Sequence, residues 1–155
     1  MKQPGAQFAS PSGISYLVGH LERLVRRRLG EAISPLGLTI QQYTALAVLG
    51  ARGQLSNAQL AERSLVTPQS ANQLVKEMEK RGWIERSADP NHGRIIHLHL
   101  TPLGQQVLKE AHAAAAKFEG DMLEGLSARD RQRYREYLSA NVRALSQTLI
   151  DPTMP

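Results

Sequence analysis

Hydrogen-bonding side chains recur at helical spacing between Thr67 and Arg81. Thr67-Pro68 is a typical helix start, because threonine caps free amides and proline at the first position loses no hydrogen bond. At about 100° per residue, Ala71 and Met78 fall on an apolar side. Hydroxyl, amide and ammonium groups occupy the first turn and the other side: Thr67, Gln69, Ser70, Asn72, Gln73 and Lys76. Such groups bond to DNA base edges or to phosphates, or they form an ordinary solvated face.

The segments on both sides of this helix favour DNA binding over a solvated face. Ser56 and Gln59 have the capping-box spacing, so they begin another short helix immediately upstream. After Gly82 the residues alternate, pass through turn formers and return as Ile95–Leu100, which predicts a β-hairpin. In such an arrangement the second helix enters a major groove and the hairpin reaches the next groove.

Further DNA contacts are expected at the hairpin tip and at the start of the first short helix. Arg94 suits the negative potential of a narrow minor groove, or it pairs on the surface with Asp89; both are compatible if the pair shapes the tip. The N-terminus beginning at Ser56 can donate amides to a phosphate. The predicted DNA-binding residues are Ser56, Asn57, Thr67, Gln69, Ser70, Asn72, Gln73, Lys76, His92 and Arg94, with Asp89 shaping the hairpin.

The rest of the chain is predicted to be helical. Residues 1–12, with two prolines, read as a flexible arm, and a helix of apolar period 3.6 follows until Gly30. Thr39 starts another helix, and Ser127 starts the last one, which has Leu149 on its inner side. The long helix from Pro102 to about Leu126 carries an apolar stripe: Leu103, Val107, Ala111, Ala114, Phe118 and Met122. The expected fold is therefore mainly α, with a small β-hairpin.

Composition restricts the possible functions of the 155 residues. The net charge of +5 favours a polyanion partner, and 5% aromatic residues argue against a stacking platform for single strands. Without cysteine, thiol nucleophiles, thiolate metal sites and thiol redox sensing are excluded. Since no catalytic motif is present, we expect no enzyme, metal or cofactor. No apolar run could span a bilayer and no signal sequence stands at the start, so a cytoplasmic protein without a membrane partner is expected.

The run from Gln59 to Leu108 closely resembles the MarR family of winged helix-turn-helix repressors. Its most specific part, Leu74 to Gly104, has an Asp-Pro opening, basic tip residues and a strand that ends in Leu-Thr before a long helix. The resemblance implies a homodimer on a palindromic operator. It also implies helical dimerisation regions at 13–36 and 102–150 around a winged helix-turn-helix unit at 37–101. The family often has two adjacent basic tip residues; here the first is Gly93, for which His92 could partly substitute.

Many members of this family are released from DNA by a small, often aromatic ligand, which usually lies between the dimerisation helices and the winged unit. In this chain Tyr16, His20, Arg23 and Arg27 share one helix face, and with Tyr43 they could hold an aromatic carboxylate. A solvated polar face is the simpler interpretation of these five residues.

A second histidine pattern admits a metal. His97 and His99 lie on the same side of a strand, a spacing that could bind a metal ion. Few carboxylates stand nearby in the sequence, so a solvated hairpin face is favoured.

These observations predict a ligand-responsive, sequence-specific dimeric regulator, expected to be a repressor, with half-sites about 34 Å apart on the operator. The alternative is a winged-helix module that binds a protein partner or DNA without sequence preference. In that case affinity for DNA would be equal for every sequence and governed by salt alone.

Overall fold

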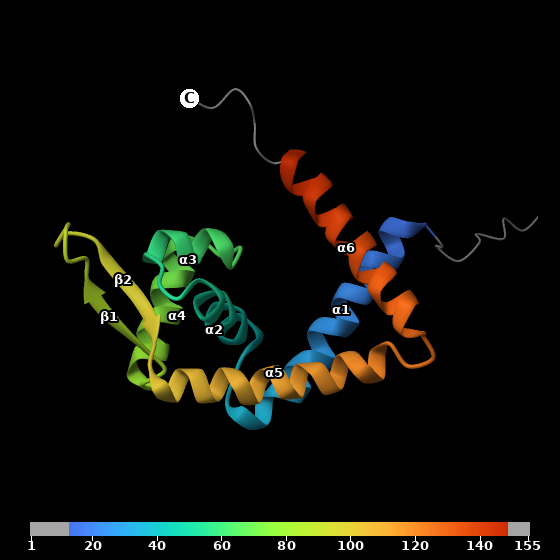
Figure 1. The fold of residues 1–155 in the computed structure, drawn as a ribbon, viewed down its shortest axis with the longest axis horizontal. Coiled ribbons are helices and arrows are strands. Elements are labelled where there is room, and N and C mark those ends of the chain that lie inside the picture. Colours follow the sequence, from blue (N-terminus) through green and yellow to red (C-terminus); the bar gives the residue numbers. More distant parts are fainter. Residues whose placement is uncertain (1–12, 149–155) are drawn as a thin grey trace, which may run out of the picture. The chain divides into compact units, whose positions relative to one another are not determined.

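The computed structural model describes residues 13–148, and the expected arm 1–12 and Leu149 lie outside that range. Its elements are α1 (Ile14–Ile33), the 3-10 turn η1 (Ser34–Leu36), α2 (Ile40–Arg52), α3 (Asn57–Arg63), α4 (Pro68–Lys80), β1 (Ile84–Ala88), β2 (Ile96–Leu100), α5 (Pro102–Met122) and α6 (Ala128–Thr148). Figure 1 shows the helices and the single hairpin in this order. The predicted fold class, mainly α with a small hairpin, is confirmed.

The chain forms two compact units, with the boundary between Phe118 and Glu119. The first contains α1 to α4, the hairpin and most of α5. The second contains the end of α5 and α6, which starts where Ser127 Oγ accepts a hydrogen bond from the Asp130 amide at 3.2 Å. Within residues 13–148 no helix is long and apolar enough to cross a membrane.

The core of the first unit joins the helix-turn-helix to its neighbours. The largest side chains with almost no exposure come from α1 to α4 and from β2: Ile33, Leu46, Leu49, Leu60, Val75, Met78 and Leu98. The predicted apolar side of α4 is buried in full: Ala71, Leu74, Val75 and Met78. Burial of this side fixes which face of α4 looks outward.

Side-chain caps set the starts of the three central helices. Thr39 with Gln42 and Ser56 with Gln59 form complete capping boxes at α2 and α3. Thr67 Oγ1 accepts the Ser70 amide at 3.1 Å to start α4, as the Thr-Pro pair predicts. Between α3 and α4, Leu65 takes a left-handed backbone conformation with φ 54°, which turns the chain sharply into α4.

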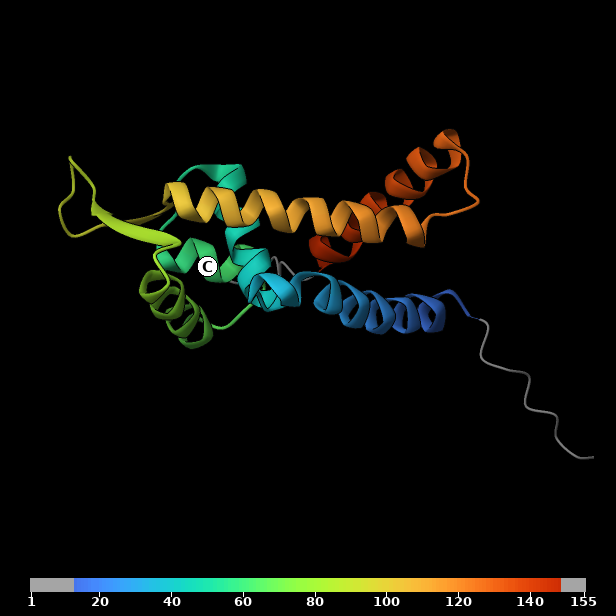
Figure 2. The same cartoon turned by 90° about the horizontal axis from the view of Figure 1, so that it is seen from below.

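The hairpin is attached to the helical unit at its base. β1 and β2 pair antiparallel from Ile84↔Leu100 to Ala88↔Ile96. Leu55, just before α3, exchanges two backbone hydrogen bonds with Leu98, and Arg86 of β1 makes a bidentate contact of 2.7 and 2.9 Å with Glu79 of α4. Beyond these attachments the hairpin projects away from the helices of this unit (Figure 2).

One sequence expectation about helices is wrong and a second is right only in part. The first helix continues through Gly30 to Ile33, and the left-handed residue that turns the chain is Gly37, with φ 71°. In α5 the buried residues are Gly104, Leu108, Ala111 and Ala115. Of the predicted stripe, Ala111 is buried and Val107 and Ala114 pack partly buried against the core, whereas Leu103 is 52% exposed and Met122 37%.

Gly104→Ala tests the joint between the hairpin and α5. A Cβ on Gly104 would overlap the backbone carbonyl of Trp83, the group that also accepts the Thr101 amide at 3.0 Å. Because backbone must move, we expect the free energy of unfolding to fall by about 1–3 kcal/mol in chemical denaturation. Gly120→Ala is the control, since a Cβ there meets nothing within 4 Å and alanine favours a helix. Equal stability of the two variants would contradict the joint.

Candidate nucleic-acid interface

The outward face of α4 brings together most of the residues predicted to bind DNA. Gln69, Ser70, Asn72, Gln73 and Lys76 are all exposed. Beside them a shallow groove of about 330 Å³ runs between α4 and the start of α2; it is lined by Thr39, Gln41, Gln69, Ser70, Gln73, Leu74 and Glu77. The arrangement gives α4 a polar surface of donors and acceptors above an apolar side held in the core.

Several of these groups are already bonded to one another. Asn57 Nδ2 donates to Asn72 Oδ1 at 2.8 Å, so the first short helix is tied to α4. Thr67 Oγ1 donates to Ser70 Oγ at 2.9 Å within the first turn. The oxygen of Asn72 is therefore engaged, and its amide nitrogen is the group it can offer to a ligand.

Glu77 joins this face without having been predicted. Its Oε1 accepts from Gln73 Nε2 at 3.1 Å, and its Oε2 accepts from Gln42 Nε2 at 3.3 Å. The spacing of four residues between Gln73 and Glu77 is a sequence signal for the first contact. Nothing local signals the second, because Gln42 lies 35 residues away in the chain.

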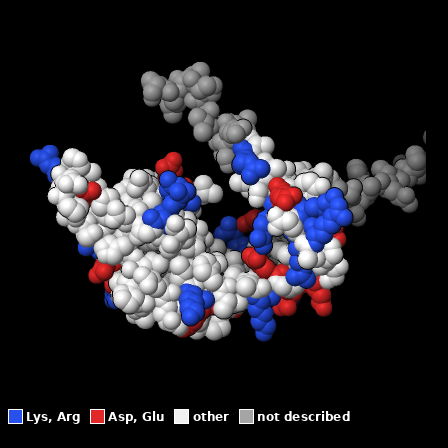
Figure 3. All heavy atoms as spheres, in the orientation of Figure 1, with Lys and Arg blue, Asp and Glu red and all other residues white. Residues whose placement is uncertain are grey.

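The hairpin tip is organised around Asp89. Its Oδ1 accepts the amides of Asn91 and His92 at 2.7 and 2.9 Å, and its Oδ2 lies 2.9 Å from His97 Nε2. The alternative pairing of Arg94 with Asp89 does not occur among residues 13–148; the hairpin register brings His97 to the carboxylate instead. Arg94 is exposed, and Figure 3 shows a basic side chain at the outer end of the hairpin.

Hydrogen bonds shift the pKa of two hairpin groups. The His97 imidazole and then the amides of Asn91 and His92 hold the pKa of Asp89 below its usual value. The hydrogen bond to Glu79 raises the pKa of Arg86 above its usual value. His99 Nε2 lies 3.0 Å from Glu85 Oε1, so each histidine once considered for a metal meets a carboxylate on the hairpin.

The residues considered for ligand binding fall into separate contacts. Tyr16 and His20 stack on α1 with ring centroids 6.0 Å apart, and Arg27 Nε is 3.8 Å from Glu31 on the same helix. Tyr43 of α2 meets α5, where its hydroxyl lies 3.1 Å from His112 Nδ1.

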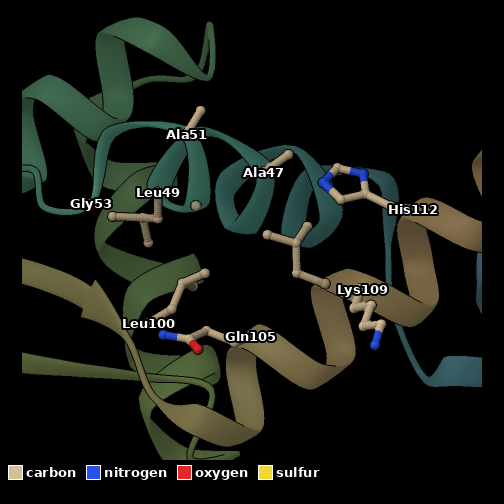
Figure 4. Close-up of a pocket in the computed structure, with 10 residues that line it drawn as sticks. Ala47, Leu49, Ala51, Gly53, Leu100, Gln105, Lys109 and His112 are labelled. Carbon is tan, nitrogen blue, oxygen red and sulfur yellow. The ribbon is translucent and has the colours of Figure 1, made fainter.

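A cavity of about 620 Å³ lies between α2, the end of β2 and α5, and the sequence did not predict it. Its lining is mostly apolar: Ala47, Leu49, Gly50, Ala51, Gly53, Leu100, Gln105, Leu108, Lys109 and His112. Figure 4 shows Gln105 and His112 at opposite ends, consistent with two helical turns, about 10 Å, between them. The sequence signal for this lining is the i, i+3, i+4, i+7 pattern, which places four residues on one face of α5: Gln105, Leu108, Lys109 and His112.

Comparison with known proteins agrees with this geometry. A family model described as the MarR family matches residues 36–95. The transcriptional repressor Rv2887 of Mycobacterium tuberculosis is 30% identical over 131 residues, covering 84% of this chain and 94% of the repressor. The chain belongs to the MarR family.

Several solved structures superpose on this one. Rv2887 in complex with salicylic acid gives a TM-score of 0.70 at 29% identity, over 83% of this chain and 96% of that one. A probable transcriptional regulator from Pseudomonas aeruginosa gives 0.72 at 29% identity, with the same coverage of 83% and 96%. A mutant MarR of Escherichia coli in complex with operator DNA shares the fold at 23% identity, with a TM-score of 0.72 over 83% of this chain and 92% of that one.

In this MarR-family regulator, a pH titration tests the hydrogen bonds of Asp89 at the hairpin tip. Because folding lowers the pKa of Asp89, its carboxylate stabilises the tip above the ordinary pKa of about 3.9, and this is lost as pH falls through the lower folded value. In NMR spectra the amide signals of Asn91 and His92 should therefore titrate below the ordinary carboxyl pKa. Asp89→Asn should remove that titration, and its persistence in the variant would contradict the assignment.

Proposed function

We propose that this MarR-family regulator binds a palindromic operator as a homodimer and represses transcription until a small aromatic ligand releases it. The observation that carries the proposal is the outward face of α4, where Gln69, Gln73 and Lys76 stand exposed opposite a fully buried side. A helix fixed in this way can enter a major groove with its polar side chains facing the base edges.

Contacts divide by chemistry into those that position the protein and those that read sequence. Lys76, Ser70 and the start of α3 at Ser56 suit phosphates, which set orientation. The amides of Gln69, Asn72 and Gln73 suit base edges, which set specificity. Arg94, with His92 beside it, reaches the adjacent minor groove from the hairpin tip, so that contact depends mainly on one arginine.

Exposed apolar residues support a homodimer. On α1 four aliphatic side chains are between 41% and 78% exposed: Ile14, Leu17, Val18 and Leu24. On α6, Tyr137 and Val142 are 65% and 64% exposed. Soluble monomers rarely leave such a series uncovered, and we propose that a second copy covers both faces and sets the distance between two α4 helices.

The DNA contacts are tested by footprinting and by affinity measurements at several salt concentrations. The wild type should protect a two-fold symmetric site in the presence of nonspecific competitor. Arg94→Ala should weaken specific binding by about 1–3 kcal/mol. Lys76→Ala should weaken binding to all sequences and lower the slope of log K against log salt by about one.

Lys117→Ala is the matched control, because it removes an exposed lysine of α5 that the proposal leaves out of the interface. Equal wild-type affinity for every sequence, governed by salt alone, would contradict an operator-specific regulator. Wild-type affinity in the Arg94 and Lys76 variants would contradict their contacts while leaving operator binding intact.

The cavity between α2 and α5 is the proposed effector site. Its walls suit an aromatic ring, while Lys109 and His112 can meet a carboxylate, with Tyr43 hydrogen-bonded to His112. Rv2887, a relative with the same fold, is known in complex with salicylic acid. The α1 face of Tyr16, His20, Arg23 and Arg27 remains the second candidate.

Salicylate titration followed by calorimetry separates the two candidate sites. Lys109→Ala should raise the dissociation constant about tenfold, the effect expected from loss of one charge-assisted hydrogen bond. His112→Ala should act in the same direction, whereas Arg23→Ala and His20→Ala should leave binding unchanged. The reverse pattern would move the site to α1, and no binding by the wild type would contradict an aromatic carboxylate effector.

A further inference from the structure

Gln42 stands out as a buried polar side chain, only 3% exposed, at the third position of α2. Its amide is bonded at both ends. The carbonyl oxygen Oε1 accepts the Thr39 amide at 3.1 Å in the capping box, and the nitrogen Nε2 donates to Glu77 Oε2 at 3.3 Å. The capping box therefore fixes an amide that in turn holds a carboxylate on the outward face of α4.

Glu77 passes this orientation to Gln73. The other carboxylate oxygen, Oε1, accepts from Gln73 Nε2 at 3.1 Å. An ionised carboxylate has only acceptors, so both glutamines must turn their nitrogen toward Glu77. The amide of Gln73 therefore has a chemically determined direction, although its side chain is exposed.

The remaining groups of Gln73 form a specific pattern. With one N–H committed to Glu77, the amide has one N–H donor and its carbonyl acceptor left for a partner. In the major groove adenine presents one acceptor, N7, beside one donor, the N6 amine. Guanine presents two acceptors, N7 and O6, so the Gln73 oxygen would face an oxygen there.

We infer that Gln73 reads an adenine in each operator half-site, and that Glu77, held by Gln42, is the positioning residue that selects adenine over guanine. This inference rests on the proposed binding of α4 in a major groove. Its location fits, because Gln73 and Glu77 both line the groove between α4 and the start of α2. The rival role for Glu77 is to accept directly from the N4 amine of a cytosine.

The test is selection of bound fragments from a random DNA library by full-length protein, followed by competition binding at the enriched position. The wild type should enrich a two-fold symmetric motif with one adenine per half-site that it prefers over guanine by about tenfold or more. Gln73→Ala should remove this preference.

Glu77→Gln keeps the size of the side chain and removes its acceptor-only character. Gln73 can then turn its oxygen inward and present two N–H donors, which suit guanine, so the preference for adenine should fall at least fivefold. The double variant should prefer adenine over guanine no less than Gln73→Ala alone does, because both changes remove the same Gln73–Glu77 recognition unit. Glu62→Gln makes the same charge change on the exposed side of α3 and should leave the preference unchanged.

The outcomes separate the inference from the function on which it rests. A symmetric wild-type motif with undiminished adenine preference in both Glu77→Gln and Gln73→Ala would overturn the inference and leave operator binding intact. Loss of a cytosine preference in Glu77→Gln would overturn it in favour of direct reading by Glu77. A wild type that enriches no motif would overturn both the inference and the proposed function.

Discussion

Burial of one side of α4 is the constraint on which the rest of the molecule depends. Ala71 and Val75 have no exposed surface, so this helix cannot rotate about its axis without exposing the core. The direction of every polar side chain on the other side follows from that. Helix starts held by side-chain caps also fix where α4 begins along its axis. A helix fixed in this way keeps its backbone orientation before any ligand arrives, which reduces the entropy lost on binding.

The hairpin depends on neighbouring elements for its stability. An isolated two-stranded hairpin is barely stable in water. Here the backbone pair of Leu55 with Leu98, the bidentate Arg86–Glu79 contact and the close approach of Gly104 to Trp83 hold its base on three different neighbours. Because Glu79 belongs to α4, the angle of the hairpin is set by the helix that it accompanies. The tip then needs only local order, which Asp89 supplies through two amides and an imidazole.

Sequence predicted what local chemistry determines. Caps at Thr67 and Ser56, the apolar side of α4 and the returning strand at Ile96–Leu100 follow from neighbouring residues, and all agree with the structure. Register and long-range packing decided the rest. His97 reaches Asp89 because the strands pair Ser87 with His97. The first helix passes through Gly30, so a glycine at this position was not by itself a stop signal. The Gln42–Glu77 contact unites segments 35 residues apart, so spacing within one helix could not predict it. The cavity between α2 and α5 had only a partial signal, the common face of Gln105, Leu108, Lys109 and His112, because its other wall comes from α2 and β2.

In the proposed complex, phosphates would repel the Glu77 carboxylate, and this would lower affinity for every DNA sequence. That uniform loss does not affect discrimination, because specificity is a difference between affinities for two sequences. A group that weakens binding to all DNA slightly and to guanine strongly increases the ratio of the affinity for adenine to the affinity for guanine. The two glutamine donors spread across both oxygens of Glu77, and this reduces the charge left facing the groove. The net charge of +5 favours DNA in general and opposes this loss, so the carboxylate is consistent with the proposed discrimination between sequences.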